Sequence, residues 1–145
     1  MISILPNLHM SDSYTAQSKF MLSHFHITHV ISFERADIRF PDIPDYNVIR
    51  LNIKDEANQN LFQYFKVIND EILKVVSSGG NILVSSTRGC GRCCAIIIAF
   101  LIQHCSFTFS SGLEHVKSKQ AATNIVNFTD QLRRFEYELE HMDTD

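Results

Sequence analysis

The chain has 145 residues, of which 45% are apolar, and a formal net charge of −3. This length and composition suit one domain with a sizeable core, and the lack of a basic excess argues against a nucleic-acid backbone or an anionic membrane as partner. The longest apolar run, at 95–102, is far shorter than the roughly 20 residues of a membrane span, and the first residues lack the pattern of a secretory signal, so we expect a soluble protein.

The first half of the chain is predicted to alternate short strands with one helix. Apolar or alternating stretches indicate strands at 2–5, 7–10, 28–33 and 47–53. An amphipathic stretch at 11–25 predicts a helix, with Ser11 or Ser13 as its amino-terminal cap. Residues 34–46 contain prolines and several turn formers, so we expect a loop there.

The second half is predicted to be mainly helical, around a central strand at 81–84. Helical spacing of apolar residues predicts helices at 60–76, 91–105, 110–119 and 127–142. The second of these is nearly free of charge, which indicates burial on most sides. Strands that alternate with helices predict an α/β fold with a central, mostly parallel sheet flanked by helices. We assign residues 1–141 to a single domain and 142–145 to a short acidic tail that frays.

Four cysteines lie at positions 90, 93, 94 and 105. Adjacent Cys93 and Cys94 make a poor disulfide framework, so we expect free thiols in a reducing compartment, the cytoplasm or the nucleus. Cys90 and Cys93 have the C-x-x-C spacing of some zinc and redox sites, but the histidines are scattered and supply no matching ligand pair. We therefore expect neither a metal nor another cofactor.

The segment from 85 to 92 joins the central strand to the buried helix. Because open α/β sheets bind ligands at the carboxyl ends of their strands, we expect an anion site there. Backbone N–H groups of residues 87–92 can line a concavity at the helix amino terminus, and Gly89 and Gly91 permit unusual dihedral angles. Arg92 can direct two donors to one phosphate. The alternative is an ordinary strand-to-helix turn with a solvated arginine.

Residues 85–93, SSTRGCGRC, resemble the phosphate-binding signature of the dual-specificity branch of cysteine-based protein tyrosine phosphatases, which reads His-Cys, two residues, Gly, two residues, Arg and Ser/Thr. The chain is also similar to that family over 4–17, 25–32, 51–65, 112–119 and 127–140. The resemblance thus covers about residues 3–140 and implies the dual-specificity phosphatase fold, without a cofactor. It also implies a phosphate-binding loop that consists of Ser86, Thr87, Arg88, Gly89, Cys90, Gly91 and Arg92.

The resemblance assigns a role to each catalytic position. Ser86 takes the place of the nucleophilic cysteine, Arg92 that of the arginine that binds the phosphate and its transition state, and Asp55 that of the general acid. Ser85 replaces the family's histidine, and Cys93 replaces a hydroxyl residue with a weaker donor. A helix amino terminus can ionise a thiol near neutral pH, whereas a serine normally needs an adjacent base, and no histidine or lysine lies within several residues of Ser86. We therefore expect phosphate binding without cleavage.

Three other features bear on the site. Asp55 could still protonate a leaving group if it faces the loop, but such an acid contributes only about 10²–10⁴-fold, and the alternative is a solvated loop carboxylate. Lys54 and Arg88 could form a weak basic rim, or could be ordinary solvated charges. The segment TNIVNF at 123–128 stands where the family has an Asn-Pro-Asn-type brace for the loop, so we expect a weakened brace.

These observations leave three hypotheses. The first is a pseudophosphatase that binds phosphorylated Ser, Thr or Tyr segments of proteins, or phosphatase and kinase signalling partners, and whose loop could hold inorganic phosphate or sulfate. The second is an active protein tyrosine/serine/threonine phosphatase, in which Ser86 is a laboratory substitution for a native cysteine or in which Cys90, Cys93 or Cys94 attacks instead. The third is an interaction scaffold that does not depend on phosphate. The oligomeric state is left open.

Overall fold

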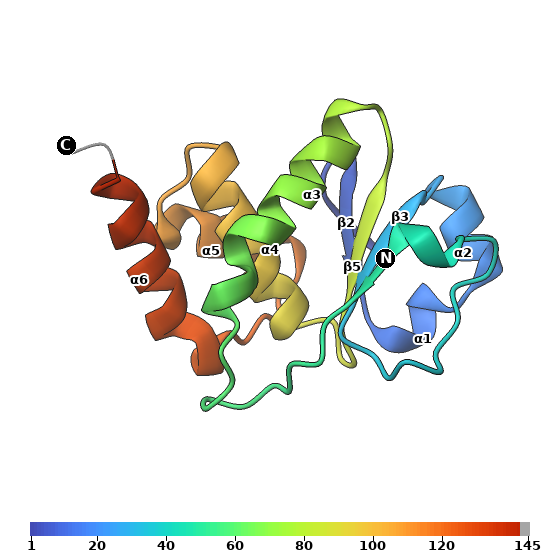
Figure 1. The fold of residues 1–145 in the computed structure, drawn as a ribbon, viewed down its shortest axis with the longest axis horizontal. Coiled ribbons are helices and arrows are strands. Elements are labelled where there is room, and N and C mark those ends of the chain that lie inside the picture. Colours follow the sequence, from blue (N-terminus) through green and yellow to red (C-terminus); the bar gives the residue numbers. More distant parts are fainter. Residues whose placement is uncertain (143–145) are drawn as a thin grey trace.

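The computed structural model describes residues 1–142, which form a five-stranded sheet (Figure 1). The strands are β1 (Ile2–Leu5), β2 (Leu8–Ser11), β3 (His29–Ser32), β4 (Val48–Arg50) and β5 (Ile82–Ser85). Their order across the sheet is β1-β2-β5-β3-β4. Only the β1–β2 pair is antiparallel among the described strands, so the predicted α/β class with a mostly parallel sheet is confirmed.

Helices cover both faces of the sheet (Figure 1). One face carries the longer helices α3 (Phe65–Ser77), α4 (Arg92–His104), α5 (Phe109–Lys119) and α6 (Thr129–Glu140). The other carries the short helices α1 (Ser13–Ala16) and α2 (Lys19–His24). Short 3-10 turns lie before β4, α3 and α6, at Asp45–Asn47, Phe62–Tyr64 and Val126–Phe128.

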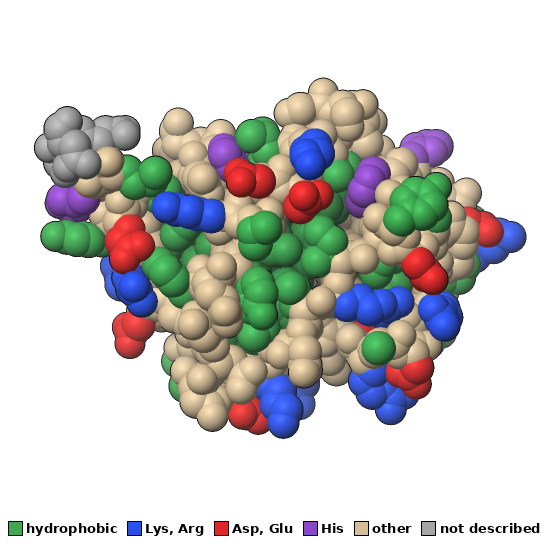
Figure 2. Space-filling view, in the orientation of Figure 1, with side chains coloured by type: hydrophobic (Ala, Val, Ile, Leu, Met, Phe, Trp, Pro, Cys, Tyr) green, Lys and Arg blue, Asp and Glu red, His purple; other side chains and the backbone are tan. Residues whose placement is uncertain are grey.

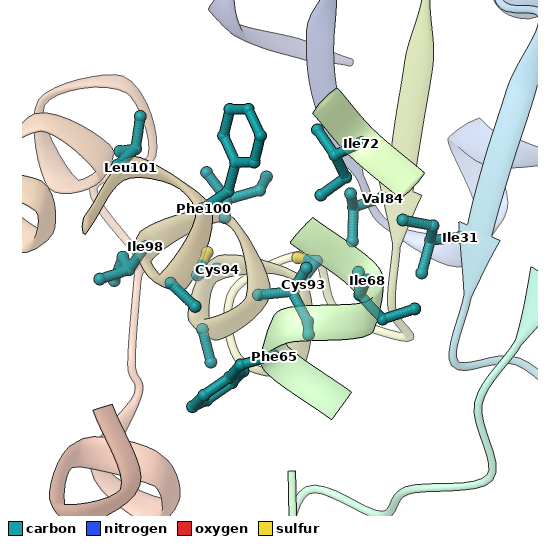
Figure 3. Packing of buried hydrophobic residues seen from close by; sticks show 14 of the residues in the cluster. Ile31, Phe65, Ile68, Ile72, Val84, Cys93, Cys94, Ile98, Phe100 and Leu101 are labelled. Carbon is teal, nitrogen blue, oxygen red and sulfur yellow. The ribbon is translucent and has the colours of Figure 1, made fainter. Parts of the chain in front are cut away.

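Helix α4 forms the centre of the larger hydrophobic core. Its residues 93–102 are all buried, as the uncharged sequence predicts, and it packs against α3, α5, α6 and the sheet. Figure 3 shows side chains from α3, α4, β3 and β5 gathered in this core. Burial of one large apolar side chain contributes about 1.5–3 kcal/mol, so many such residues anchor α4. The amino-terminal end of α4 therefore has a fixed position relative to the end of β5.

Two local predictions in the first half are wrong. The stretch 11–25 forms two short helices rather than one, capped by Asp12 and Ser18 instead of Ser11 or Ser13. Ser11 cannot cap because it ends β2 and its hydroxyl donates to the Asp12 carbonyl, whereas the Asp12 carboxylate accepts the N–H of Thr15. The predicted strand at 47–53 is observed only at Val48–Arg50, although the Leu51 N–H still donates to the Ser32 carbonyl of β3 at 2.9 Å.

The surface carries mixed charges. Figure 2 shows Lys and Arg side chains interspersed with Asp and Glu over one face, and ion pairs such as Lys19–Asp42 and Arg35–Asp37 join exposed side chains. Surface pairs of this kind contribute about 0–1 kcal/mol each. No described helix has both the length and the apolar character needed to span a membrane. Apart from Met142, the predicted tail lies outside the described residues.

Candidate functional site

The 86–92 loop lies at the carboxyl end of the middle strand of the sheet. β5 ends at Ser85, and α4 begins at Arg92 after Gly91, without a side-chain cap. A cavity of about 280 Å³ opens here, and it is lined by Asp55, Ser86, Thr87, Arg88, Gly91 and Arg92. The structure therefore brings Asp55 from a distant segment to the loop. Of the predicted loop residues, Gly89 and Cys90 do not line the cavity.

The backbone of the loop presents donors without partners. Within residues 1–142, no acceptor is found for the N–H groups of Thr87, Arg88, Cys90, Gly91 and Arg92. The neighbouring N–H groups are committed, because Ser86 donates to the Ser11 carbonyl at 3.3 Å and Gly89 to the Ser86 carbonyl at 3.0 Å. Unpaired N–H groups at a helix amino terminus attract anions, both by hydrogen bonding and by the helix dipole.

Two glycines allow the chain to take this path. Gly89 has a φ of +68°, and a β-carbon there would lie 2.8 Å from the Asp12 backbone nitrogen. A side chain at this position would therefore be strained and would also collide with the backbone. A β-carbon at Gly91 would lie 2.5 Å from Asp55 Oδ2, so the missing side chain lets that carboxylate approach the loop.

Arg92 is held along one side of the cavity. Its Nη1 donates to the Ile53 carbonyl at 2.8 Å, its Nη2 donates to Thr87 Oγ1 at 3.1 Å, and its guanidinium lies 5.4 Å from the centre of the Phe33 ring. The buried Nε has no partner among the described residues. The guanidinium is thus oriented by the protein and retains a donor that an anion could use.

Ser86 and Cys93 form a hydroxyl–thiol pair at the base of the loop. Ser86 is 2% exposed, and its Oγ accepts the Cys93 backbone N–H at 3.3 Å. Within residues 1–142, no histidine, lysine or carboxylate contacts this hydroxyl, and the Cys93 thiol that does contact it is completely buried. Ser85, at the end of β5, donates from its hydroxyl to the Asp12 carbonyl at 3.4 Å.

The other thiols do not supply a replacement nucleophile. The structure shows all four cysteines as free, and Cys93 and Cys94 are completely buried. Burial, followed by the nearby Cys93 and Asp55, raises the pKa of Cys90. The hydrogen bond with the Cys93 thiol, together with burial, raises the pKa of Cys94. Cys90, which is partly exposed, and Cys94 therefore remain neutral thiols at pH 7. Hydrogen bonds with the Cys94 thiol and the Ser86 hydroxyl lower the pKa of Cys93, but the Cys93 side chain is completely buried and does not line the cavity.

Asp55 is fixed over the loop by Asn127, which lies in the 123–128 segment that the sequence analysis compared with the family's brace but did not connect with Asp55. The Asn127 side-chain amide donates to the Asp55 carbonyl at 2.9 Å and to its Oδ1 at 3.0 Å. The segment around Asp55 is further tied by Gln59, whose Oε1 accepts the Lys54 N–H at 3.1 Å, and by Gln131, which accepts the N–H of Leu61 at 2.8 Å. Asp55 is thus a cavity residue and not a free loop carboxylate.

Residues 120–124 hold the 86–92 loop by two hydrogen bonds, and the expected weakening of the brace relative to the family stays a prediction. The Asn124 N–H donates to the Cys90 carbonyl at 2.7 Å, and the Gln120 side chain donates to the Gly89 carbonyl at 3.2 Å. A backbone N–H can make such a contact whatever side chain the residue carries, so the missing motif did not predict a missing brace. The 86–92 loop is held on its outer side despite the unusual sequence.

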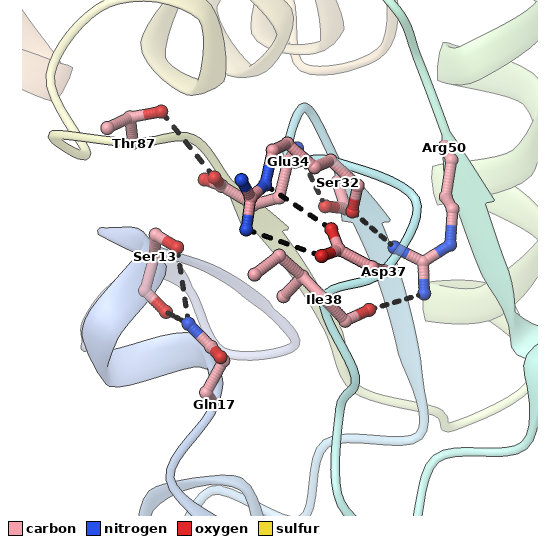
Figure 4. Close-up of polar contacts among 9 residues, drawn as sticks. Ser13, Gln17, Ser32, Glu34, Asp37, Ile38, Arg50 and Thr87 are labelled. Carbon is pink, nitrogen blue, oxygen red and sulfur yellow. Dashed lines mark hydrogen bonds and ion pairs between the residues drawn. The ribbon is translucent and has the colours of Figure 1, made fainter.

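Charged residues at the cavity rim have both signs. Arg88 and Lys54 are exposed, and neither has an ion-pair partner in the described part of the chain. Glu34, which the sequence analysis missed, lies beside the loop, and its Oε2 accepts the Thr87 hydroxyl at 3.5 Å (Figure 4). The Thr87 hydroxyl therefore lies between the Glu34 carboxylate and the Arg92 guanidinium.

Residues 8–138 match the family model described as the dual specificity phosphatase catalytic domain. The chain is 30% identical over 140 residues to dual specificity protein phosphatase 1 of Arabidopsis thaliana, with 94% of this chain and 69% of that protein covered. It is 26% identical over 144 residues to the serine/threonine/tyrosine-interacting protein A of Xenopus laevis, with 94% and 64% covered. Three other curated relatives are much longer, and the chain spans 17% to 20% of their length.

The fold is shared with solved structures. The human DUSP28 crystal structure superimposes with a TM-score of 0.90 at 22% identity, covering 99% of this chain and all of that one. At this identity the likeness concerns the fold alone.

Proposed function

The chain belongs to the dual-specificity phosphatase catalytic-domain family, and we propose that it binds phosphorylated Ser, Thr or Tyr segments of proteins without hydrolysing them. The observation that carries the proposal is a contrast within one cavity. The unpaired backbone N–H groups and Arg92 form an anion site, whereas Ser86, at the nucleophile position, has no base.

Binding follows from the donors that converge on the cavity. A phosphate has several strong acceptor oxygens, and charge-assisted hydrogen bonds from N–H groups to such oxygens are roughly twice as strong as neutral ones. The loop offers the amides of residues 87–92 that lack partners, and Arg92 adds a fixed positive charge. The exposed, unpaired Arg88 at the mouth can add a further cation. A phosphorylated side chain that enters the cavity therefore exchanges hydrogen bonds with water for hydrogen bonds with donors that the protein holds in place.

Hydrolysis fails at the first step. In a phosphatase of this family a thiolate attacks phosphorus, and a helix amino terminus suffices to ionise a thiol near neutral pH. A serine hydroxyl is far less acidic and attacks only when a neighbouring base removes its proton. Ser86 Oγ accepts the Cys93 N–H, which cannot take a proton, and it also contacts the completely buried Cys93 thiol; no histidine, lysine or carboxylate of the described residues is in contact to act as the base. Asp55 can protonate a leaving group, but it cannot create a nucleophile.

A titration with matched peptides tests the binding half of the proposal. We expect a phosphopeptide to bind and its unphosphorylated twin to bind at least about tenfold more weakly, since even one charge-assisted hydrogen bond contributes about 1.5–3 kcal/mol. Equal affinities would refute the proposal and favour the phosphate-independent scaffold. The Xenopus relative is named as a serine/threonine/tyrosine-interacting protein, which is in line with a binding role.

An active phosphatase is the second candidate, and one observation favours it. Asn127 holds Asp55 against the loop, and Asn124 braces Cys90, so the geometry around the missing thiol is intact. If residue 86 of the native gene is cysteine, this arrangement would serve catalysis. Reading codon 86 of the gene distinguishes the two cases directly.

Two variants measure how much of the defect lies at residue 86. Ser86→Cys restores the thiol, and Ser86→Cys/Cys93→Ser also restores the hydroxyl that the family places after the arginine. We expect hydrolysis of an aryl phosphate to appear in the single variant and to increase in the double variant, because a hydroxyl is a better donor than a thiol. Failure of both variants would show that the loop does not hold phosphate in an attackable position.

A further inference from the structure

A second group of hydrogen-bonded polar residues lies at the opposite end of the sheet from the 86–92 loop. Ser3 and His9 face each other across the β1–β2 pair, and Asn81 immediately precedes β5. Ser3 Oγ lies 2.8 Å from His9 Nδ1, and His9 Nε2 lies 3.1 Å from Asn81 Oδ1. A hydroxyl, an imidazole and an amide are therefore connected in series.

The contacts of His9 determine where its proton lies. Asn81 Oδ1 can only accept a hydrogen bond, so Nε2 carries the proton and Nδ1 is free to accept the Ser3 O–H. His9 is 3% exposed, and the Phe25 ring packs edge-on at 5.6 Å. Burial, against the opposing hydrogen bond with Asn81, lowers the pKa of His9, which keeps the imidazole neutral at pH 7.

Ser3 itself is accessible. It is exposed on β1, the edge strand of the sheet, and the pairing register with β2 is irregular between Ser3 and Leu5. Irregularities of this kind bend a strand and redirect its side chains, and they are frequent at sheet edges. A small electrophile can therefore reach the Ser3 hydroxyl while the buried imidazole stays behind it.

Another hydroxyl–imidazole pair in the chain lacks these properties. Thr28 Oγ1 also lies 2.8 Å from the Nδ1 of a histidine, His29. That hydroxyl is already bound to the backbone carbonyl and N–H of Asn81, both at 3.0 Å. No group orients the far nitrogen of His29 within residues 1–142. The Ser3 arrangement, with an oriented base behind a free hydroxyl, thus differs from a simple surface contact.

We propose that Ser3 is an activated serine that accepts an acyl group from an activated ester. The Ser3 Oγ attacks the carbonyl carbon and forms a new C–O bond, while the hydroxyl proton passes to His9 Nδ1. The ester's own C–O bond then breaks, and the leaving alkoxide takes the proton from His9. Asn81 orients the imidazole and stabilises the transient cation. This site does not share residues with the cavity at the 86–92 loop, so it stands independently of the proposed phosphate binding.

Acetylation by p-nitrophenyl acetate tests the proposal, with the modified residues located by peptide mass spectrometry. We expect acetylation of Ser3 to be at least about tenfold faster than that of Ser110 or Thr28, because general-base assistance contributes about 10²–10⁴-fold. Ser110 is a matched control, since it is exposed and has no side-chain hydrogen bond within the described residues. Ser3→Ala removes the fast site.

Variants of Asn81 separate an orienting role from simple packing. Asn81→Asp keeps an acceptor opposite Nε2 and is expected to retain or increase the rate at Ser3. Asn81→Ala is expected to lower it toward the rate of Ser110. Equal acetylation rates at Ser3 and Ser110 in the parent chain would overturn the proposal. An unchanged rate at Ser3 in both Asn81 variants, with circular dichroism showing that both are folded, would also overturn it.

Discussion

Replacing Arg92 by alanine removes the fixed positive charge of the candidate site. Nη1 donates to the Ile53 carbonyl and Nη2 donates to Thr87 Oγ1, which leaves Nε and the second N–H of Nη2 without a partner among the described residues. Loss of one charge-assisted hydrogen bond costs about 1.5–3 kcal/mol, which corresponds to roughly a 10- to 150-fold increase in the Kd for a phosphopeptide. Arg92→Lys keeps the charge but not the planar fork, so we expect an intermediate loss.

Isothermal titration of the phosphopeptide into each variant measures these changes. Arg39→Ala is the matched control, because Arg39 is exposed, pairs with Asp45 and does not line the cavity. We expect the control to bind like the parent chain. Thermal unfolding establishes that each variant is folded, which matters because Arg92 also holds the Ile53 carbonyl. A folded Arg92→Ala variant that binds the phosphopeptide with unchanged Kd would refute the assignment of the site.

Three more variants or conditions test parts of the structure. Gly89→Ala forces a side chain into left-handed backbone and against the Asp12 nitrogen, so we expect a loss of about 1–3 kcal/mol in unfolding free energy by denaturant titration; an unchanged midpoint would contradict the loop geometry. Asn127→Ala frees Asp55, and we expect faster amide hydrogen exchange at 54–60, whereas unchanged exchange would show that Asn127 is not the clamp. The pKa of His9 in the folded chain lies below 6.5, so the unfolded chain binds a proton at His9 at a higher pH than the folded chain does. We therefore expect the His9 contribution to the unfolding free energy to be complete above pH 6.5 and to fall as the pH drops from 6.5 to the lowered pKa. The fall in unfolding free energy should be smaller in His9→Gln.

The strongly patterned elements of the fold were predictable from the sequence. The helix predicted at 91–105 is observed at Arg92–His104, because a long uncharged stretch can only be buried at the centre of a layer. The helix predicted at 110–119 begins at Phe109, and the central strand predicted at 81–84 is β5. The split of 11–25 was not predictable from periodicity, because it depends on the caps at Asp12 and Ser18.

The candidate site was predictable where local sequence controls it. The glycines and Arg92 act through backbone geometry and a helix terminus within one short segment, and Gly91 and Arg92 line the cavity, whereas Gly89 does not. Contacts between distant segments left no local signal. Asn127 reaches Asp55 across 72 positions, and Glu34 reaches Thr87 across 53. Such pairs result from the packing of the 3-10 turn at Val126–Phe128 and of the segment that follows β3 around the loop, which no single stretch of sequence encodes.

Phosphate release from an aryl phosphate, measured alongside binding of a phosphopeptide, tests the central claim most directly. The account predicts that the chain with Ser86 binds the phosphopeptide and releases no phosphate above background. Hydrolysis by this chain that disappears in Arg92→Ala would contradict the account, because it would show that the cavity contains a working nucleophile.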